Sequence, residues 1–172
     1  MSEQQPVVLV PSRYADWAAM AAGMARRIHR LAPASQVEHI GSTAVPDLAA
    51  KDVVDLLVGV GKDRILAVAG ELAAAGFDLE GTLPGHCWLS YPARAERRYV
   101  LHVVEFGGRP WQRRLAFRNL LRSDPQARER YLAAKRDAAD GSSGWDAYTQ
   151  AKTPVVSELL AGMTDEQPTA RY

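Results

Sequence analysis

The chain has 172 residues, of which 47% are hydrophobic and 24% charged, so it can bury the core of one domain without cross-links. Its single cysteine, Cys87, excludes an intramolecular disulfide framework and any zinc cluster built on cysteines. No apolar run approaches the roughly 18 residues of a membrane helix, and the polar, acidic start of the chain is unlike a secretory signal. We therefore expect a soluble, cytoplasmic protein with no membrane partner.

The first half of the chain reads as a mixed sheet with two helices. Val7–Val10 is an edge strand or lead-in, and a helical period follows over Ala15–Leu31, with Asp16 as its expected N-cap. Lys62–Ala75 is predicted to be a second helix that ends at Gly76. Apolar or alternating runs predict strands at Val37–Ile40, Val53–Val60, Phe77–Leu79, Trp88–Tyr91 and Tyr99–Glu105.

The second half reads as helices. They are expected at Trp111–Arg122, from a capping box at Ser123 to about Ala139, and at Trp145–Leu160 with a disturbance at Pro154. A mixed sheet followed by helices predicts an α+β fold, or α/β with an appended helical layer. We expect a single domain, with a lead-in at 1–10, a mixed-sheet core at 11–110, a helical layer at 111–160 and a polar tail at 161–172.

Positive charge is concentrated in one segment. The net charge is only +1, but residues 94–136 hold 12 Lys/Arg and 4 Asp/Glu, a local balance of +8. Such a segment in a nearly neutral protein suggests a local anionic ligand, although a solvated helical face is the alternative. RNA binding is a weaker third possibility, because few aromatic residues interleave with the arginines and no nucleic-acid motif is present.

A turn at Gly41-Ser42-Thr43 follows the strand that ends at Ile40. Turns of this kind let backbone N–H groups and hydroxyls approach a phosphate closely. Gly41, Ser42 and Thr43 are therefore candidate phosphate-binding residues, although a Gly-Ser pair alone is also common in any tight turn.

Asp55 lies inside the buried run Val53–Val60, where a carboxylate is costly unless it is paired or bound to a cation. It is a candidate catalytic or metal-binding residue, or else a buried acid bonded to backbone N–H groups or to a neighbouring Arg or His. Asp52, three residues earlier, points to the opposite face of a regular strand and is expected at the strand entrance. Lys51 could neutralise phosphate from the same place.

Two histidines are further candidates. His102 lies on the strand Tyr99–Glu105, and cross-strand neighbours could bring it to Asp55 as an acid, a base or a weak metal ligand. His39 immediately precedes the Gly-Ser turn. Either side chain could instead be an ordinary core histidine.

Two helical pairs complete the set of candidates. Arg118 and Arg122 share a helix face with Arg114, and guanidinium groups suit phosphate oxygens. We expect this face to lie across a ligand cleft from the Gly-Ser turn, with Arg118 pointing at it. Tyr148 and Lys152, also four residues apart, could stack on a base and neutralise charge.

The segment from His39 to Asp55, His-Ile-Gly-Ser-Thr-Ala-Val-Pro…Leu-Ala-Ala-Lys…Val-Val-Asp, resembles the signature of the GrpB family. The resemblance runs from about Pro11 to Leu160. Members of that family occur alone or fused behind dephospho-coenzyme A kinase. The later residues that match are Leu101-His102-Val103, Phe117–Arg122, Pro125, Tyr131, Lys135, Tyr148 and Lys152.

The family in turn resembles nucleotidyltransferases of the polymerase-β type. That resemblance implies two alternating strand aspartates and a third carboxylate, which hold two divalent metals. Here Asp55 matches the second aspartate, but the first position is Val53 and the later strand offers His102. These residues predict at most a weak metal site, with Mg²⁺ or Mn²⁺ completed by nucleotide oxygens.

Two functions remain in competition. The first is nucleotidyl or phosphoryl transfer from a nucleotide or phosphorylated small molecule to a small acceptor, with Asp55, His102 and His39 in catalysis. The second is a non-catalytic nucleotide-sensing or scaffold module with a degenerate metal site. In both cases the expected partner is a small molecule and not a nucleic acid.

Overall fold

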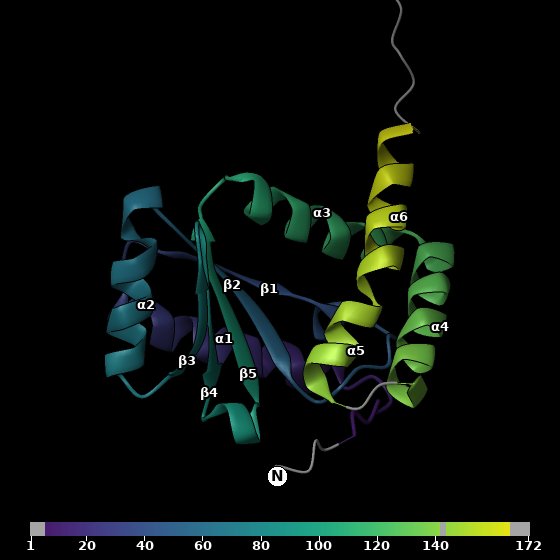
Figure 1. The fold of residues 1–172 in the computed structure, drawn as a ribbon, viewed down its shortest axis with the longest axis horizontal. Helices are drawn as coiled ribbons and strands as arrows, with labels where there is room; N and C mark the ends of the chain where they lie inside the picture. The colour runs from purple at the N-terminus through teal and green to yellow at the C-terminus, as the bar shows by residue number, and fades with distance from the viewer. Residues whose placement is uncertain (1–5, 142–143, 166–172) are drawn as a thin grey trace, which may run out of the picture.

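The computed structural model describes residues 6–141 and 144–165 as a five-stranded sheet and its surrounding helices (Figure 1). The strand order is β1-β2-β5-β4-β3; β2 and β5 are parallel and the other neighbours are antiparallel. The strands are β1 (Gln36–Ile40), β2 (Val54–Val60), β3 (Asp78–Leu83), β4 (His86–Tyr91) and β5 (Tyr99–Glu105).

The α-helices are α1 (Tyr14–Leu31), α2 (Ile65–Ala74), α3 (Arg109–Ser123), α4 (Pro125–Gly141), α5 (Trp145–Ala151) and α6 (Thr153–Asp165). Short 3₁₀ turns are η1 (Ser42–Ala44), η2 (Lys62–Arg64) and η3 (Arg94–Glu96). None of the helices in the described ranges combines the length and apolarity that crossing a membrane takes.

The two faces of the sheet meet different helices. Leu56 and Val58 of β2 point to a core shared with α1 and α2, because alternate residues of a strand face opposite sides. Leu57 points the other way, to Trp111 of α3. Asp55 shares the parity of Leu57, so its carboxylate belongs to the α3 face and not to the main core.

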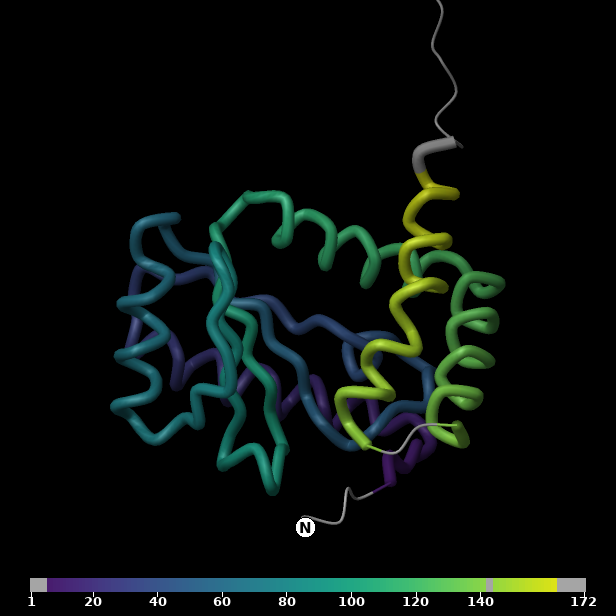
Figure 2. Tube along the Cα trace, viewed as in Figure 1, coloured from purple at the N-terminus to yellow at the C-terminus, as the bar shows by residue number. Residues whose placement is uncertain are grey.

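The last helices form a second cluster beside α3. Leu121, Tyr131 and Leu159, from α3, α4 and α6, pack on Val45 and Leu48, which follow η1. Figure 2 shows α6 in yellow running alongside α4 in green at the end of the molecule away from α2. This packing holds the helical layer against the Gly-Ser turn and the entrance of β2.

The predicted α+β class is confirmed, and so is the place of β2. It is an interior strand between β1 and β5, as its near-continuous run of apolar residues predicted. The predicted break near Pro154 is also confirmed, because α5 ends at Ala151 and a new helix begins at Thr153, where proline is tolerated in the first turn.

Several predicted boundaries were wrong. Asp16 is not an N-cap; α1 begins at Tyr14, and Asp16 pairs with Arg13. Ser123 ends α3 and its hydroxyl bonds back to the Asn119 carbonyl, so Asp124 caps α4 by accepting from two backbone N–H groups.

At the chain ends, Val10 makes only an isolated bridge to Ala50 and no strand forms at Val7–Val10. The last helix continues past Leu160 to Asp165, so part of the predicted polar tail is helical. The remainder of that tail, residues 166–172, lies outside the described residues, as do residues 1–5 of the lead-in and residues 142–143 of the loop before α5.

Candidate functional site

The Gly-Ser turn is built around the carboxylate of Asp55. Gly41 has φ 73° and ψ −172°, a conformation that favours glycine, and a Cβ atom placed on it would lie 2.7 Å from Asp55 Oδ2. Ile40 and Asp55 are partners in the β1–β2 register, so the turn leaves β1 directly over the acid. Glycine is therefore required here both for the backbone angle and for the close approach.

A contact between the side chains of His39 and Thr43 stabilises this turn. His39 Nε2 lies 2.9 Å from Thr43 Oγ1, and Thr43 is buried. Burial lowers the pKa of His39 to about 4, against the opposing effect of Asp55, so the ring is neutral at pH 7. The two side chains stabilise each other; the predicted contact of Thr43 with phosphate and the predicted catalytic role of His39 stay predictions.

Asp55, His102 and His86 form a chain across three strands. His102 Nε2 lies 3.9 Å from Asp55 Oδ1, which confirms their predicted proximity but is longer than a hydrogen bond. His102 Nδ1 lies 3.0 Å from His86 Nε2, so one ring donates to the other. A proton on His102 Nε2 is favoured by the nearby carboxylate, which leaves Nδ1 to accept from His86.

The charge states of this chain follow from its surroundings. Burial alone would raise the pKa of Asp55, but His102 and Lys51 outweigh it and lower the pKa, so the acid is ionised at pH 7. Burial lowers the pKa of His102, and it lowers the pKa of His86 to about 3. The site therefore holds one carboxylate beside two neutral imidazoles.

Lysines surround the carboxylate. The chain has only four, and three of them, Lys51, Lys135 and Lys152, meet on this side of the sheet. Lys51 Nζ lies 3.1 Å from the centre of the Trp145 ring and Lys152 Nζ lies 4.2 Å from that of Tyr148. The segment before β2, helix α4 and the α5–α6 junction thus each contribute one ammonium group.

These lysines are partly or fully buried and lie near one another. Burial lowers the pKa of Lys51 to about 7 and that of Lys152 to about 8, although Asp55 opposes both shifts. Lys135 is 1% exposed and donates to the Ala49 carbonyl; burial lowers its pKa to about 7, with Lys152 and Lys51 contributing. With these pKa values the lysines are only partly protonated at pH 7 in the ligand-free protein, and a bound anion would raise their pKa and favour the ammonium form.

Tyr148 adds an unpartnered polar group to the same place. It is fully buried, and its hydroxyl makes no hydrogen bond to the described protein atoms. Burial raises its pKa, and Tyr131 and Asp55 raise it further, which places the hydroxyl within electrostatic reach of both. An unsatisfied buried hydroxyl beside a cluster of cations suits a bound ligand or water.

The arginines of α3 divide their roles differently from the prediction. Arg118 Nη1 donates to Glu38 Oε2 at 2.7 Å and to the His39 carbonyl at 3.0 Å, and Arg122 Nε donates to the Ala44 carbonyl at 2.8 Å. Arg118 therefore contacts the end of β1 directly and not across a cleft, which corrects our expectation. Both arginines clamp the segment that carries the Gly-Ser turn.

Arg114 is the arginine of α3 whose charge interacts with Asp55, His102 and His86. Burial lowers its pKa, Asp55 opposes that shift, and its charge in turn lowers the pKa of both His86 and His102. The sequence pattern placed Arg114 on the right helix face but favoured its neighbours, because a helix period alone does not say which residue of the face lies over the acid.

Asp52 has a structural role, as the strand phase predicted. Its carboxylate accepts from Trp17 Nε1 at 2.7 Å and from Arg13 Nη1 at 3.1 Å, on the side of the sheet opposite Asp55. It therefore cannot supply the carboxylate that Val53 lacks.

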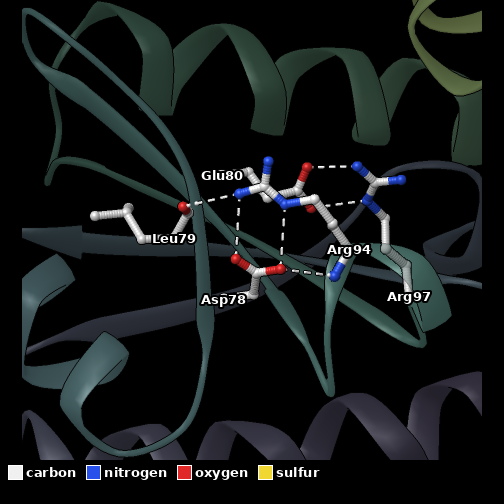
Figure 3. A network of polar contacts seen from close by, with 5 residues as sticks. All are labelled: Asp78, Leu79, Glu80, Arg94 and Arg97. Carbon is white, nitrogen blue, oxygen red and sulfur yellow. Dashed lines mark hydrogen bonds and ion pairs between the residues drawn. The ribbon is translucent and has the colours of Figure 1, made fainter.

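A second acid, Glu80, closes the far side of the lysine cluster. Arg97 donates to both of its oxygens, and next to this pair Arg94 binds Asp78 (Figure 3). The Arg97 guanidinium also lies 4.6 Å from the centre of the Trp145 ring. Glu80 is thus already neutralised by a largely buried arginine, and part of the basic segment 94–136 is engaged in internal ion pairs.

The donor set does not suit the two-metal centre that the fold resemblance implies. In the described ranges, no three His, Cys, Asp or Glu side chains gather closely enough to hold a metal. Asp55 faces ammonium groups where that fold would place further carboxylates. A hollow of about 250 Å³ lies elsewhere, between Gly59 and Phe106 at the carboxyl end of β2 and β5. The candidate site is therefore identified by its charged side chains and not by the size of a cavity.

His86, Lys135, Tyr131 and Arg114 were missing from the predicted site. Three of them had a signal: Arg114 shares the helix face of Arg118 and Arg122, and Tyr131 and Lys135 lie among the residues that match the GrpB pattern. Burial raises the pKa of Tyr131 to about 12, with the Ser42 hydroxyl beside it opposing the shift, so this side chain joins α4 to the Gly-Ser turn.

Comparison with solved structures places the fold. GrpB from Enterococcus faecalis aligns with a TM-score of 0.75 and 27% identity, over 91% of this chain and 99% of that chain. The Cid1 poly(U) polymerase with Mg and 3′-dATP bound aligns with a TM-score of 0.53 and 14% identity, over 84% of this chain and 49% of the other. The second likeness shows a nucleotidyltransferase-like fold and nothing finer.

Sequence relatives agree with that assignment. A UPF0157 protein of Deinococcus radiodurans is 40% identical over 84% of this chain and 76% of its own length. A dephospho-CoA kinase of Mycolicibacterium paratuberculosis is 35% identical over 87% of this chain, which spans 44% of that longer protein. The family model described as GrpB protein matches residues 6–161, and the chain therefore belongs to the GrpB family.

Proposed function

We propose that this protein binds a nucleotide or another phosphorylated small molecule on the α3 face of the sheet, between the Gly-Ser turn, Asp55 and the lysines. One observation carries the proposal. Three of the four lysines converge, partly or fully buried, around a single carboxylate, and an anion bound there would supply the counter-charge that keeps them protonated.

The reaction class that suits this arrangement is transfer of a nucleotidyl or phosphoryl group to a small acceptor. Asp55 is ionised and close to His102, so it can accept or orient the proton of an attacking hydroxyl. Gly41 and Ser42 would cradle phosphate and Lys51, Lys152 and Arg114 would neutralise it, while Tyr148 offers its free hydroxyl. The likeness to Cid1, a poly(U) polymerase with selectivity for UTP, supports the class of ligand by fold analogy alone.

The competing function is nucleotide sensing without catalysis. Val53 at the position of the first strand aspartate favours it, because one carboxylate cannot bridge two metals. A divalent cation would bind only weakly to Asp55 and His102 alone, and the nucleotide would supply its remaining oxygen ligands.

A thermal-shift screen tests the proposal. ATP, GTP, CTP and UTP, each with MgCl₂ and with EDTA, should include at least one that raises the melting temperature in proportion to its concentration relative to Kd. Release of pyrophosphate or phosphate by the stabilising nucleotide then separates transfer from sensing. Failure of every nucleotide and of inorganic tripolyphosphate to stabilise the protein would refute the proposed function.

A further inference from the structure

The nucleotidyltransferase-like fold implies magnesium at the position of the strand carboxylates, and the residues present do not fit that ion. Magnesium prefers several oxygen ligands in an octahedron. Around Asp55 the chain places nitrogen instead: His102 at 3.9 Å, and the ammonium groups of Lys51 and Lys152 within electrostatic reach. This disagreement has a chemical meaning of its own.

We infer that the protein's own ammonium groups take the place of the divalent cations, so that Lys51, Lys152 and Lys135 bind a polyphosphate without metal. The inference rests on the proposed function and names how that site recognises its ligand. Lysine is well suited to the role, because its ammonium is a compact point charge that can accompany phosphate oxygens.

The arrangement of the lysines supports direct contact by two of them. Lys51 and Lys152 are partly exposed, and their ammonium groups lie against the rings of Trp145 and Tyr148 with no hydrogen bond to a carboxylate among the described residues. Lys135 donates a hydrogen bond to the Ala49 carbonyl and contributes its charge without contacting the ligand. The Tyr148 hydroxyl, unpartnered in the described protein, is a further donor for the same anion.

The cluster costs stability when no anion is bound. Like charges repel across a poorly solvated region, and each ammonium loses hydration there. Removing one lysine relieves that repulsion but also takes a positive charge away from Asp55, so the free energy of unfolding should change little while the affinity for the ligand falls. A merely structural lysine would behave in the opposite way, because its loss would destabilise the protein.

The experiment measures binding of inorganic tripolyphosphate and ATP by calorimetry, once with EDTA and once with MgCl₂. Wild-type protein should bind tripolyphosphate in EDTA within a few-fold of its affinity in MgCl₂. Lys152→Gln and Lys51→Gln should each lose about tenfold or more in affinity, since each removes a charge-assisted contact, with melting temperatures close to that of the wild type. Lys62→Gln, at the exposed fourth lysine on η2, is the matched control and should bind as the wild type does.

Three results would overturn the inference. Binding that appears only with MgCl₂ would refute it and leave the proposed function standing. An equal loss in Lys62→Gln would show diffuse charge and not a site. Absence of binding in both media would remove the inference together with the proposed function.

Discussion

The main chain of Gly41 packs directly against the carboxylate of Asp55, with room for no side-chain atom between them. A Cβ atom on Gly41 would lie 2.7 Å from Asp55 Oδ2, 3.2 Å from its Cβ and 3.3 Å from its Cγ. The turn and the acid are therefore one unit: the backbone that could bind phosphate also fixes where the carboxylate points.

Gly41→Ala should disrupt this unit. Its φ of 73° strains any other residue, at a cost of roughly 1–3 kcal/mol in the free energy of unfolding, and the new methyl group displaces Asp55 as well. Gly107→Ala is the matched control, because Gly107 has φ 72° and a Cβ atom added there would meet nothing within 4 Å. Urea unfolding should show the larger loss at Gly41, with weaker nucleotide binding; equal losses would mean that the contact with Asp55 relaxes freely.

Asp52→Ala should damage the fold and spare the ligand. The change leaves Trp17 Nε1 without its 2.7 Å acceptor in a fully buried side chain, which costs about 1–3 kcal/mol. Chemical denaturation should report that loss, while tripolyphosphate affinity stays at the wild-type value. A large change in affinity would place Asp52 in the site despite its position on the other side of the sheet.

Substitution of Arg118 should reduce stability, and substitution of Arg114 should reduce ligand affinity. Arg118→Met removes the donor to Glu38 and to the His39 carbonyl, so we expect a loss of about 1–3 kcal/mol in stability. Arg114→Met removes a partly buried charge near Asp55 and should lower tripolyphosphate affinity with little effect on unfolding. The two positions differ by one helical turn, so each variant controls for the other; identical behaviour would contradict the division of roles.

The strand, its acid and the lysines Lys51 and Lys152 could be predicted as candidates from sequence, and the place of Lys135 beside them could not. The run from Val53 to Val60 specifies an interior strand by its apolar pattern, and strand parity alone separates Asp52 from Asp55. The meeting of Lys51 with Lys135 depends on how α4 packs on the segment that precedes β2, where Lys135 donates to the Ala49 carbonyl. That is a contact between residues far apart in the chain, and no local period encodes it.

His86 was missed because the predicted strand began at Trp88, whereas β4 begins at His86, and because the same limit applies to strand pairing. Its pairing with His102 depends on the β4–β5 register, where His86 stands opposite Val104, two residues beyond His102 and on the same face. A single sequence predicts that both strands exist but not their offset, and an offset of one residue would turn either ring to the other face.

The end of α3 shows a similar limit at a helix terminus. Ser123 donates to the Asn119 carbonyl, and this local hydrogen bond replaced the predicted cap.

The imidazole pair should make the protein sensitive to mild acid. His86 is held neutral, with its pKa lowered to about 3 chiefly by burial and also by His102 and Arg114. In the unfolded chain its pKa is about 6.5, so below that pH the unfolded state binds a proton that the folded state refuses. Its contribution to stability is therefore fully present above about pH 6.5 and falls as the pH drops from there toward about 3.

His86→Gln should remove part of that loss. Urea unfolding at pH 7 and pH 5 stays above the range in which carboxylates such as Asp55 titrate. The buried lysines also take up protons in this range, but they do so in the wild type and in His86→Gln alike, so the comparison of the two proteins reports His86. Wild-type protein should lose stability between the two pH values, His86→Gln should lose less, and His29→Gln, at an exposed position on α1, should match the wild type. If His86→Gln instead falls as steeply as the wild type, the proton enters elsewhere, and His39, whose pKa burial lowers to about 4, becomes the group that governs acid sensitivity.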